Sequence, residues 1–184
     1  MRSPYLHLFA GLATTIGVIL YLHIRPAVAA GTVAHVENKF QFTVYAPFEK
    51  VAPLFGAFEE RAWAGEKWNP LFLYPRPPRD VQGEVFLVEH GHGHATAIWI
   101  NTAFDLQSGH LQYAYVVPEM QAVLIDIHLS RHDAPVSTDV DVVYQRTALK
   151  PELNEHITEI GHKDRQNAPE WSSAIERYLA VNSH

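Results

Sequence analysis

The sequence predicts an α+β fold in which one curved antiparallel sheet of six to seven strands packs against a long C-terminal helix. Three observations predict it. A strand-like segment at the start of the domain leads into two short helical segments, and five further strand-like runs follow with short connections. Short connections favour antiparallel strands that are neighbours in the sheet. The chain then ends in a long amphipathic helix, which can cover the concave face of such a sheet.

The first strand is predicted within residues 33–45, where apolar and polar side chains alternate. This alternation is typical of a strand with one buried face. Pro47 ends the strand and is well placed at the start of a helix. Apolar residues at helical spacing then predict two short helices, over residues 48–55 and 57–64.

The middle of the chain predicts a meander of strands. Residues 67–80 contain four prolines, so this segment holds at most an irregular strand around Leu71–Tyr74. Beyond it, turn signals separate the strand-like runs from one another. These runs are residues 83–89, 95–104, 110–117, 121–130 and 137–147.

Residues 151–181 form the predicted C-terminal helix, because their apolar residues recur along one stripe. Gly161 and Pro169 weaken this helix, and a kink or break is expected near Asn167-Ala168. The stripe comprises Ile157, Ile160, Asp164, Ala168, Trp171, Ile175, Tyr178 and Leu179.

The first 30 residues have the layout of a secretory signal peptide. Arg2 precedes the uncharged run Leu8–Leu22, and Ala27 and Ala29 supply the small residues of a cleavage site. An uncleaved N-terminal membrane anchor is the alternative. We therefore expect a single folded domain over residues 31–184 that is exported to the periplasm or the cell exterior, and a membrane partner only if the N-terminal segment is retained.

Composition excludes several classes of function. The chain of 184 residues has no cysteine, which excludes disulfides, thiolate zinc sites and cysteine nucleophiles. Its formal net charge of −6 argues against nucleic acid or an anionic membrane surface as the main partner. No G-x-S-x-G, H-E-x-x-H or phosphate-loop motif occurs. No catalytic residue and no cofactor are therefore predicted.

Several local patterns, in order, resemble the START-like or Bet v 1-like superfamily, also called SRPBCC or polyketide cyclase/dehydrase-type, over Val33 to Val181. They are FTVYAPFEKV (residues 42–51), WAGEKWNP (63–70), AIWI (97–100) followed by Phe104-Asp105, YAYVVP (113–118) and TDVDVVY (138–144), the last strand ending in Thr147-Ala148-Leu149. The resemblance implies a helix-grip fold, with a cavity between the sheet and the long helix that takes an apolar small molecule. It does not imply one activity, because the superfamily includes lipid carriers, hormone receptors and aromatase/cyclases.

Aromatic residues are the best candidates for the lining of this cavity. A tyrosine or tryptophan can present its ring to a ligand and its polar tip to an orienting contact. The alternative for each of them is a place in the ordinary hydrophobic core. The candidate ligand-binding residues are Trp63, Trp68, Trp99, Tyr113, Tyr115, Tyr144 and Trp171.

The stretch EHGHGH, residues 89–94, raises the question of a metal site. In a continuous strand His90, His92 and His94 would lie on one side and could approach a zinc or copper ion. The intervening glycines favour a turn between two strands instead, and a turn scatters the three imidazoles. A solvent-exposed turn is therefore the preferred interpretation, with ligand contact at the cavity mouth and metal binding as alternatives.

Two further polar residues that could carry chemistry lie in the run 121–130. Asp126 and His128 alternate with apolar residues that are expected to face the cavity or the helix. An Asp–His pair at this spacing can serve as an orienting group and a base. On the outer face of the sheet it would be far from any ligand, so a solvated surface is the preferred interpretation.

The function predicted from the sequence is that of an exported binding or carrier protein for an apolar small molecule, either a lipid or an aromatic metabolite. One alternative is an enzyme similar to the polyketide cyclases and aromatases, which would need a tyrosine, histidine or carboxylate with a shifted pKa inside the cavity. A histidine-rich metal binder is the other alternative. The oligomeric state stays open.

Overall fold

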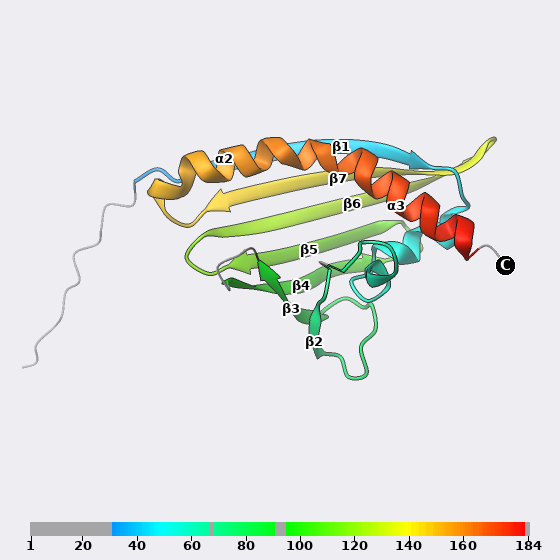
Figure 1. Cartoon of the computed structure of the whole chain (residues 1–184), viewed down its shortest axis with the longest axis horizontal. Coiled ribbons are helices and arrows are strands. Elements are labelled where there is room, and N and C mark those ends of the chain that lie inside the picture. The colour runs from blue at the N-terminus through cyan, green and yellow to red at the C-terminus, as the bar shows by residue number, and fades with distance from the viewer. Residues whose placement is uncertain (1–30, 67, 91–94, 183–184) are drawn as a thin grey trace, which may run out of the picture.

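The computed structural model describes residues 31–66, 68–90 and 95–182, and Figure 1 shows its elements. Seven antiparallel strands form one sheet in the order β1-β7-β6-β5-β4-β3-β2. The predicted α+β class and strand number are confirmed. The strands are β1 (His35–Val44), β2 (Leu71–Tyr74), β3 (Val85–His90), β4 (Ala95–Asp105), β5 (His110–Val117), β6 (Gln121–Asp133) and β7 (Val136–Ala148).

From β2 to β7, each strand lies beside its predecessor in the sheet, as expected when successive strands are joined by short connections. Only β1 departs from this rule, because it pairs with β7 along its whole length, from His35 opposite Thr147 to Val44 opposite Thr138. The two edges of the sheet are therefore β1 and β2. The segment between β1 and β2 must cross one end of the sheet, and it carries the short helices there (Figure 1).

Alternation along the strands separates two faces of the sheet. In β6, the side chains of Val123, Ile125, Ile127 and Leu129 are buried, whereas Asp126 and His128 lie on the opposite, more accessible face. This confirms the orientation predicted for that run. The outer face is not uniformly polar, since Ile98, Ile100 and Val116 on β4 and β5 are also exposed.

The segment after β1 contains one turn of α-helix, α1 (Phe48–Val51), which continues as the 3₁₀-helix η1 (Ala52–Phe55). The second predicted short helix, residues 57–64, is reduced to the 3₁₀ turn η2 (Glu59–Ala62). A carboxylate from elsewhere in the chain explains this turn. Asp80 accepts hydrogen bonds from the backbone N–H groups of Phe58 (2.7 Å) and Glu59 (3.2 Å), which satisfies donors at its start.

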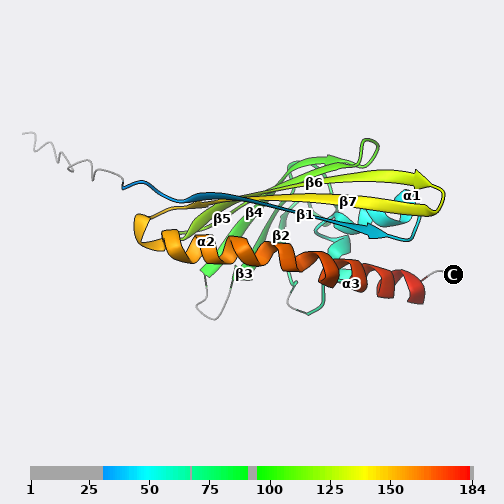
Figure 2. The ribbon, with the colours of Figure 1, turned by 90° about the horizontal axis from the view of Figure 1, so that it is seen from above.

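The C-terminal helix is divided into η4 (Pro151–Leu153), α2 (Asn154–Lys163), η5 (Asp164–Gln166) and α3 (Asn167–Val181). The break predicted near Asn167-Ala168 is confirmed, and it lies immediately before that position. Pro169 has no backbone N–H to donate into the preceding turn, which favours an interruption there. Seen from above, α2 and α3 form a second layer on one side of the sheet (Figure 2).

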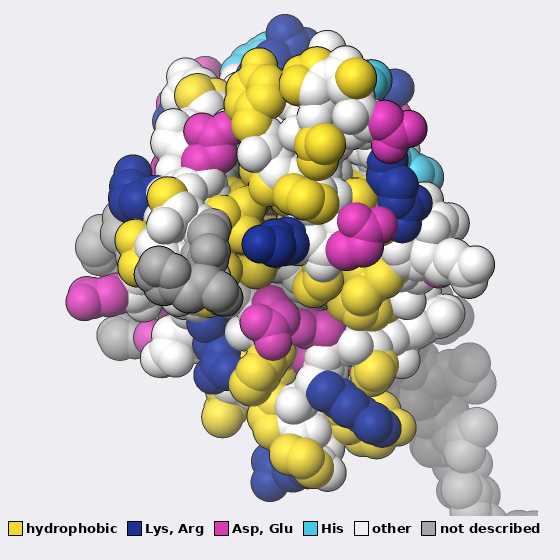
Figure 3. All heavy atoms as spheres, turned by 90° about the vertical axis from the view of Figure 1, so that its right-hand side faces the viewer, with side chains coloured by type: hydrophobic (Ala, Val, Ile, Leu, Met, Phe, Trp, Pro, Cys, Tyr) yellow, Lys and Arg dark blue, Asp and Glu magenta, His cyan; other side chains and the backbone are white. Residues whose placement is uncertain are grey.

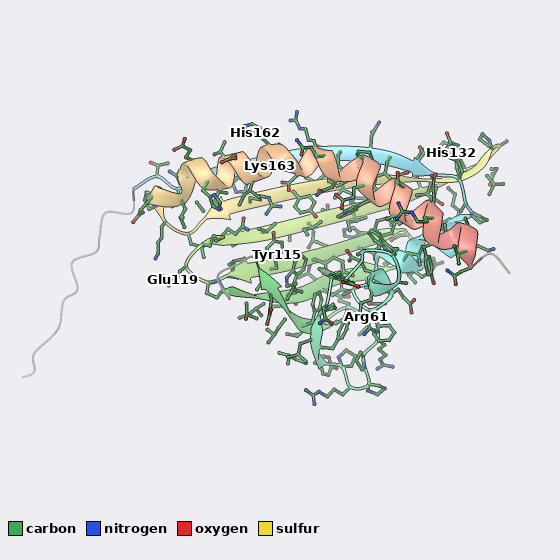
Figure 4. The ribbon with its side chains drawn as sticks, in the orientation of Figure 1. Arg61, Tyr115, Glu119, His132, His162 and Lys163 are labelled. Atoms are coloured by element: carbon green, nitrogen blue, oxygen red, sulfur yellow. The ribbon has the colours of Figure 1, made fainter. Side chains whose placement is uncertain are left out.

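The β6–β7 hairpin is longer than predicted. Residues 131–135 were expected to connect the two strands, but β6 continues to Asp133 and only Ala134 and Pro135 form the turn. Side-chain contacts explain the extension: the Arg131 guanidinium lies 3.6 Å from the centre of the Phe48 ring, and His132 pairs with Asp139 at 2.6 Å. Figure 4 places His132 at this end of the sheet.

None of the described helices is long and apolar enough to span a membrane. Residues 1–30, the predicted signal peptide or anchor, lie outside the described residues.

Candidate ligand-binding cavity

A cavity of about 200 Å³ lies between the inner face of the sheet, the η1–η2 segment and α3. It is found at the end of the molecule where α3 and the short helices come together in Figure 1, and Figure 3 shows that the surface at this end mixes hydrophobic side chains with basic and acidic ones. The wall is mainly aromatic. Its lining residues are Phe55, Glu60, Trp63, Trp68, Trp99, Tyr113, Ile125, Ile127, Tyr144 and Trp171.

Trp171 connects the helix side of the cavity with the sheet side. Its ring lies edge-on to Phe40 of β1, with centroids 5.5 Å apart, and edge-on to Trp63, at 5.9 Å. Edge-to-face packing of this kind is favourable because the positive ring edge meets the negative ring face. α3 is therefore held against the sheet through an aromatic side chain that also forms part of the cavity wall.

Trp63 and Trp68 are fixed by hydrogen bonds to the backbone of η1 and of the segment between η1 and η2. The indole N–H of Trp63 donates to the carbonyl of Leu54 (2.7 Å), and that of Trp68 donates to the carbonyl of Ala57 (3.0 Å). These bonds occupy the polar tips of both rings. Trp63 and Trp68 therefore present mainly apolar surface to the cavity.

Trp99 on β4 differs from them. Its ring stacks on Tyr115, with centroids 4.1 Å apart, and on Phe86, at 5.6 Å. Its indole N–H is buried and has no hydrogen-bond partner within the described part of the chain. A buried donor without a partner is unfavourable.

Six of the seven aromatic residues predicted to line the cavity do so: Trp63, Trp68, Trp99, Tyr113, Tyr144 and Trp171. That they contact a ligand stays a prediction. Tyr115 points to the same face of the sheet but lies beyond the cavity, where its hydroxyl accepts a hydrogen bond from Arg146 at 2.8 Å. Figure 4 shows Tyr115 on the middle of the sheet.

Glu60 is the one carboxyl group among the described residues that line the cavity, and the sequence pattern did not single it out. The apolar surroundings remove water from the carboxyl, and the nearby charge of Asp80 opposes its ionisation. Together they raise the pKa of Glu60 to about 8. At neutral pH Glu60 is therefore mainly a neutral acid, able to donate a hydrogen bond into the cavity.

Further polar groups are buried near the cavity: Glu84 just before β3, Asn101 on β4 and Tyr113 on β5. Glu84 is fully buried, and no hydrogen bond within the described structure reaches either of its carboxyl oxygens. Burial first, and then the charge of Asp80, raise the pKa of Glu84 to about 8, although Asn101 acts in the opposite direction. The Tyr113 hydroxyl donates to the carbonyl of Phe55 at 2.9 Å, and burial keeps its pKa well above the ordinary value.

A buried ion pair lies beside the cavity. The guanidinium of Arg146 on β7 donates from Nε to Asp164 Oδ2 (2.8 Å) and from Nη2 to Asp164 Oδ1 (2.6 Å). It also bonds Gln121 Oε1 at 3.2 Å, in addition to the Tyr115 hydroxyl. Because Asp164 begins η5, this pair ties the break in the C-terminal helix to the sheet. The helical periodicity of the sequence placed Asp164 on the buried stripe but gave no indication that Arg146 is its partner.

The EHGHGH motif is only partly described. β3 ends at His90, which pairs with Ala95 at the start of β4. His92 and His94 lie outside the described residues, as does the side chain of His90. The solvent-exposed turn preferred for this motif, and the alternatives of ligand contact and metal binding, therefore stay predictions.

The sequence matches no protein-family model and no curated protein. Solved structures are similar to this chain in fold. Norcoclaurine synthase from Thalictrum flavum aligns with a TM-score of 0.60 at 11% identity, over 98% of this chain and 99% of its own. The same enzyme in complex with dopamine and hydroxybenzaldehyde aligns with a TM-score of 0.60 at 10% identity, over 95% of this chain and 98% of its own.

Two further structures support the same fold. Ara h 8.0201 aligns with a TM-score of 0.55 at 14% identity, over 81% of this chain and 100% of its own. The Mll3558 protein from Rhizobium loti aligns with a TM-score of 0.55 at 17% identity, over 77% and 99%. The chain therefore has the Bet v 1-like helix-grip fold that the sequence resemblance implied. At these identities the likeness shows the fold and not the activity.

Proposed function

We propose that this protein binds a small, mainly apolar molecule, about the size of one substituted aromatic ring, between its sheet and α3. The observation that carries the proposal is the aromatic cavity of about 200 Å³. A dry apolar cavity of about 150 Å³ is enough to hold benzene. The volume favours an aromatic metabolite over a long-chain lipid, the other ligand class compatible with the sequence.

Two polar groups would orient such a ligand. The neutral carboxyl of Glu60 and the unpaired N–H of Trp99 are both hydrogen-bond donors. A ligand with a carbonyl or ether oxygen would complement them. The binding of single-ring molecules by a structural neighbour, norcoclaurine synthase in complex with dopamine and hydroxybenzaldehyde, is compatible with this ligand class. The layout of residues 1–30 supports the further proposal that the domain acts outside the cytoplasm.

Tryptophan fluorescence offers a direct test, because all four tryptophans of the chain line the cavity. Acetophenone, a neutral ring with one carbonyl group, is expected to change the emission on binding. Ile127→Phe fills the cavity and should weaken this binding about tenfold or more. Leu124→Phe makes the same kind of change on the outer face of β6 and should leave it unaltered.

Palmitate serves as the long-chain probe in the same assay. Saturable acetophenone binding that Ile127→Phe alone weakens supports the proposal. Binding of palmitate without any response to acetophenone would contradict it in favour of a lipid carrier. A response that both variants retain would place the probe outside the cavity and contradict the proposal as well.

The raised pKa of Glu60 predicts a pH dependence. Below pH 8 the carboxyl is protonated and can donate to the acetophenone oxygen, whereas above pH 8 it becomes a carboxylate and repels that oxygen. Affinity should therefore be level from pH 5 to 7 and fall about tenfold by pH 9, as expected when one hydrogen bond is lost. Glu60→Gln keeps a donor that does not titrate, so its affinity should not change with pH. An equal fall in both proteins would exclude Glu60 as the cause.

The same carboxyl supports a second candidate, an enzyme in which Glu60 transfers a proton to or from a bound carbonyl compound. A carboxyl with a pKa of about 8 exchanges protons readily near neutral pH. It meets the condition set by the sequence for a cyclase-like enzyme. Exchange of the acetophenone methyl protons in D₂O, followed by NMR, separates the candidates. Acceleration by the wild-type protein and none by Glu60→Gln, with binding retained, would indicate an enzyme.

A further inference from the structure

On the face of the sheet opposite the cavity, three side chains of β5 and β6 converge: His110, Asp126 and His128. Ile127 lines the cavity, so its neighbours in β6 necessarily point to the other side. His110 lies directly opposite His128 in the β5–β6 pair. The two imidazole rings are parallel, at an angle of 9°, with their centroids 4.6 Å apart.

The potential ligand atoms of these residues are close enough for one metal ion. Nε2 of His110 lies 2.8 Å from Asp126 Oδ1, and Nε2 of His128 lies 3.3 Å from Asp126 Oδ2. One ligand atom from each residue falls within 4.8 Å of the others. Zinc bonds of about 2.0–2.2 Å place tetrahedral ligand atoms roughly 3.3 Å apart, so only small side-chain adjustments are needed.

The surroundings hold the carboxylate in place. Gln112, opposite Asp126 in the β5–β6 pair, donates to Asp126 Oδ1 at 3.2 Å. The Thr102 hydroxyl in turn donates to Gln112 Oε1 at 2.9 Å. Such outer hydrogen bonds orient metal-ligating carboxylates and raise metal affinity. The cluster therefore has ligands on two rigid, paired strands and a supporting residue behind the central ligand.

The local charge favours a cation. Among the described residues, no lysine or arginine forms an ion pair with Asp126. Asp141 lies opposite His128 across the β6–β7 pair, and Asp105 lies opposite His110 across the β4–β5 pair. Side chains directly opposite one another on adjacent strands have Cβ atoms about 5 Å apart. Two acidic residues therefore occupy the positions next to the cluster on the neighbouring strands, which makes the local charge negative.

We propose that His110, Asp126 and His128 form a binding site for one divalent transition-metal ion on the outer face of the sheet. Two imidazole nitrogens and one carboxylate oxygen suit zinc and its neighbours better than magnesium or calcium, which prefer oxygen ligands. His128 is more than half exposed, so water or a partner's ligand can complete the coordination. The site is independent of the cavity, because the sheet separates the two.

Calorimetric titration of the purified full chain with zinc chloride, after treatment with EDTA, tests this proposal. A stoichiometry of one high-affinity ion is expected. His110→Gln and His128→Gln should each weaken binding about thirtyfold or more, since each removes one of three protein ligands. Two matched controls should bind zinc as the wild type does: His132→Gln, which alters an exposed histidine on the same strand, and His92→Gln, which alters the EHGHGH motif.

Cobalt(II) provides a second readout, because its visible absorption reports ligand number and geometry in the same site. The spectrum should be lost in the His110 and His128 variants and kept in both controls. Circular dichroism and the acetophenone response show whether a variant is folded, and Asp126→Asn replaces any variant that is not. Unchanged zinc affinity in the His110 and His128 variants, or a loss confined to His92→Gln, would overturn the proposal.

Discussion

Replacement of Asp164 by alanine is expected to destabilise the protein by about 3–5 kcal/mol, the range measured when one partner of a buried ion pair is removed. Arg146 and Asp164 are 5% and 4% exposed, and two hydrogen bonds join them. Without the carboxylate, the guanidinium keeps neutral partners among the described residues, the Tyr115 hydroxyl, Gln121 Oε1 and the face of the Tyr144 ring, and its buried charge is left without a counter-charge. Urea unfolding followed by circular dichroism measures the loss.

The double variant Arg146→Met, Asp164→Leu is the matched control. It removes both charges and fills their space with apolar side chains, so its stability should lie within about 1–2 kcal/mol of the wild type. Recovery in the double variant attributes the loss in Asp164→Ala to the unpaired charge. A loss below about 1 kcal/mol in Asp164→Ala would contradict the role of this pair, because it would mean that water or another group compensates Arg146.

Replacement of Glu84 by glutamine is expected to have the second large effect, and this effect depends on pH. Burial and the charge of Asp80 raise the pKa of Glu84 from 4.5 to about 8. Between pH 4.5 and 8 this carboxyl is therefore protonated in the folded protein and ionised in the unfolded chain. The stabilisation from this proton is fully present below pH 4.5 and disappears as pH rises through 8. The wild type should therefore lose about 3 kcal/mol relative to Glu84→Gln between pH 5 and 8.

The measurement is the free energy of unfolding of both proteins across this pH range. Glu60 and Asp80 titrate in both proteins, so their effects cancel in the difference to first order. Glu152→Gln, a change at an exposed carboxyl, is the control and should show no such widening with pH. A constant difference between wild type and Glu84→Gln from pH 5 to 8 would mean that Glu84 ionises as readily in the folded protein as in the unfolded chain.

Much of the fold could be predicted because its signals are local. Alternating side chains mark the strands, short connections make them neighbours, and the apolar stripe with Pro169 predicts an interrupted C-terminal helix. The predictions of the second short helix and of the β6–β7 turn were less accurate. Each depends on a partner far away in the sequence: Asp80 for η2, and Phe48 for the extension of β6 through Arg131.

In the candidate site, too, features set by local sequence were predicted and features set by distant partners were not. Aromatic residues were selected by type and by their positions on strands, and most of them line the cavity. Tyr115 was the exception, because the position of Arg146 across the sheet decides what its hydroxyl meets. Glu60 was missed because a lone glutamate in a short helix is usually solvated. Its pKa is raised by burial among the aromatic walls and by the charge of Asp80, and both arise only in the folded structure.

Residue order along the chain was sufficient for a curved antiparallel sheet covered by a C-terminal helix, since this follows from periodicity over a few residues. The family resemblance then implied the helix-grip fold with its cavity, and residue type picked out the aromatic side chains of the interior. The pairing of the buried charges and the convergence of the three proposed metal ligands required the three-dimensional structure. Arg146 meets Asp164, and His110 meets His128, only because strand register and helix docking bring them together. Desolvation and pairing act through distances in space, and these distances are set by the packing of the whole domain.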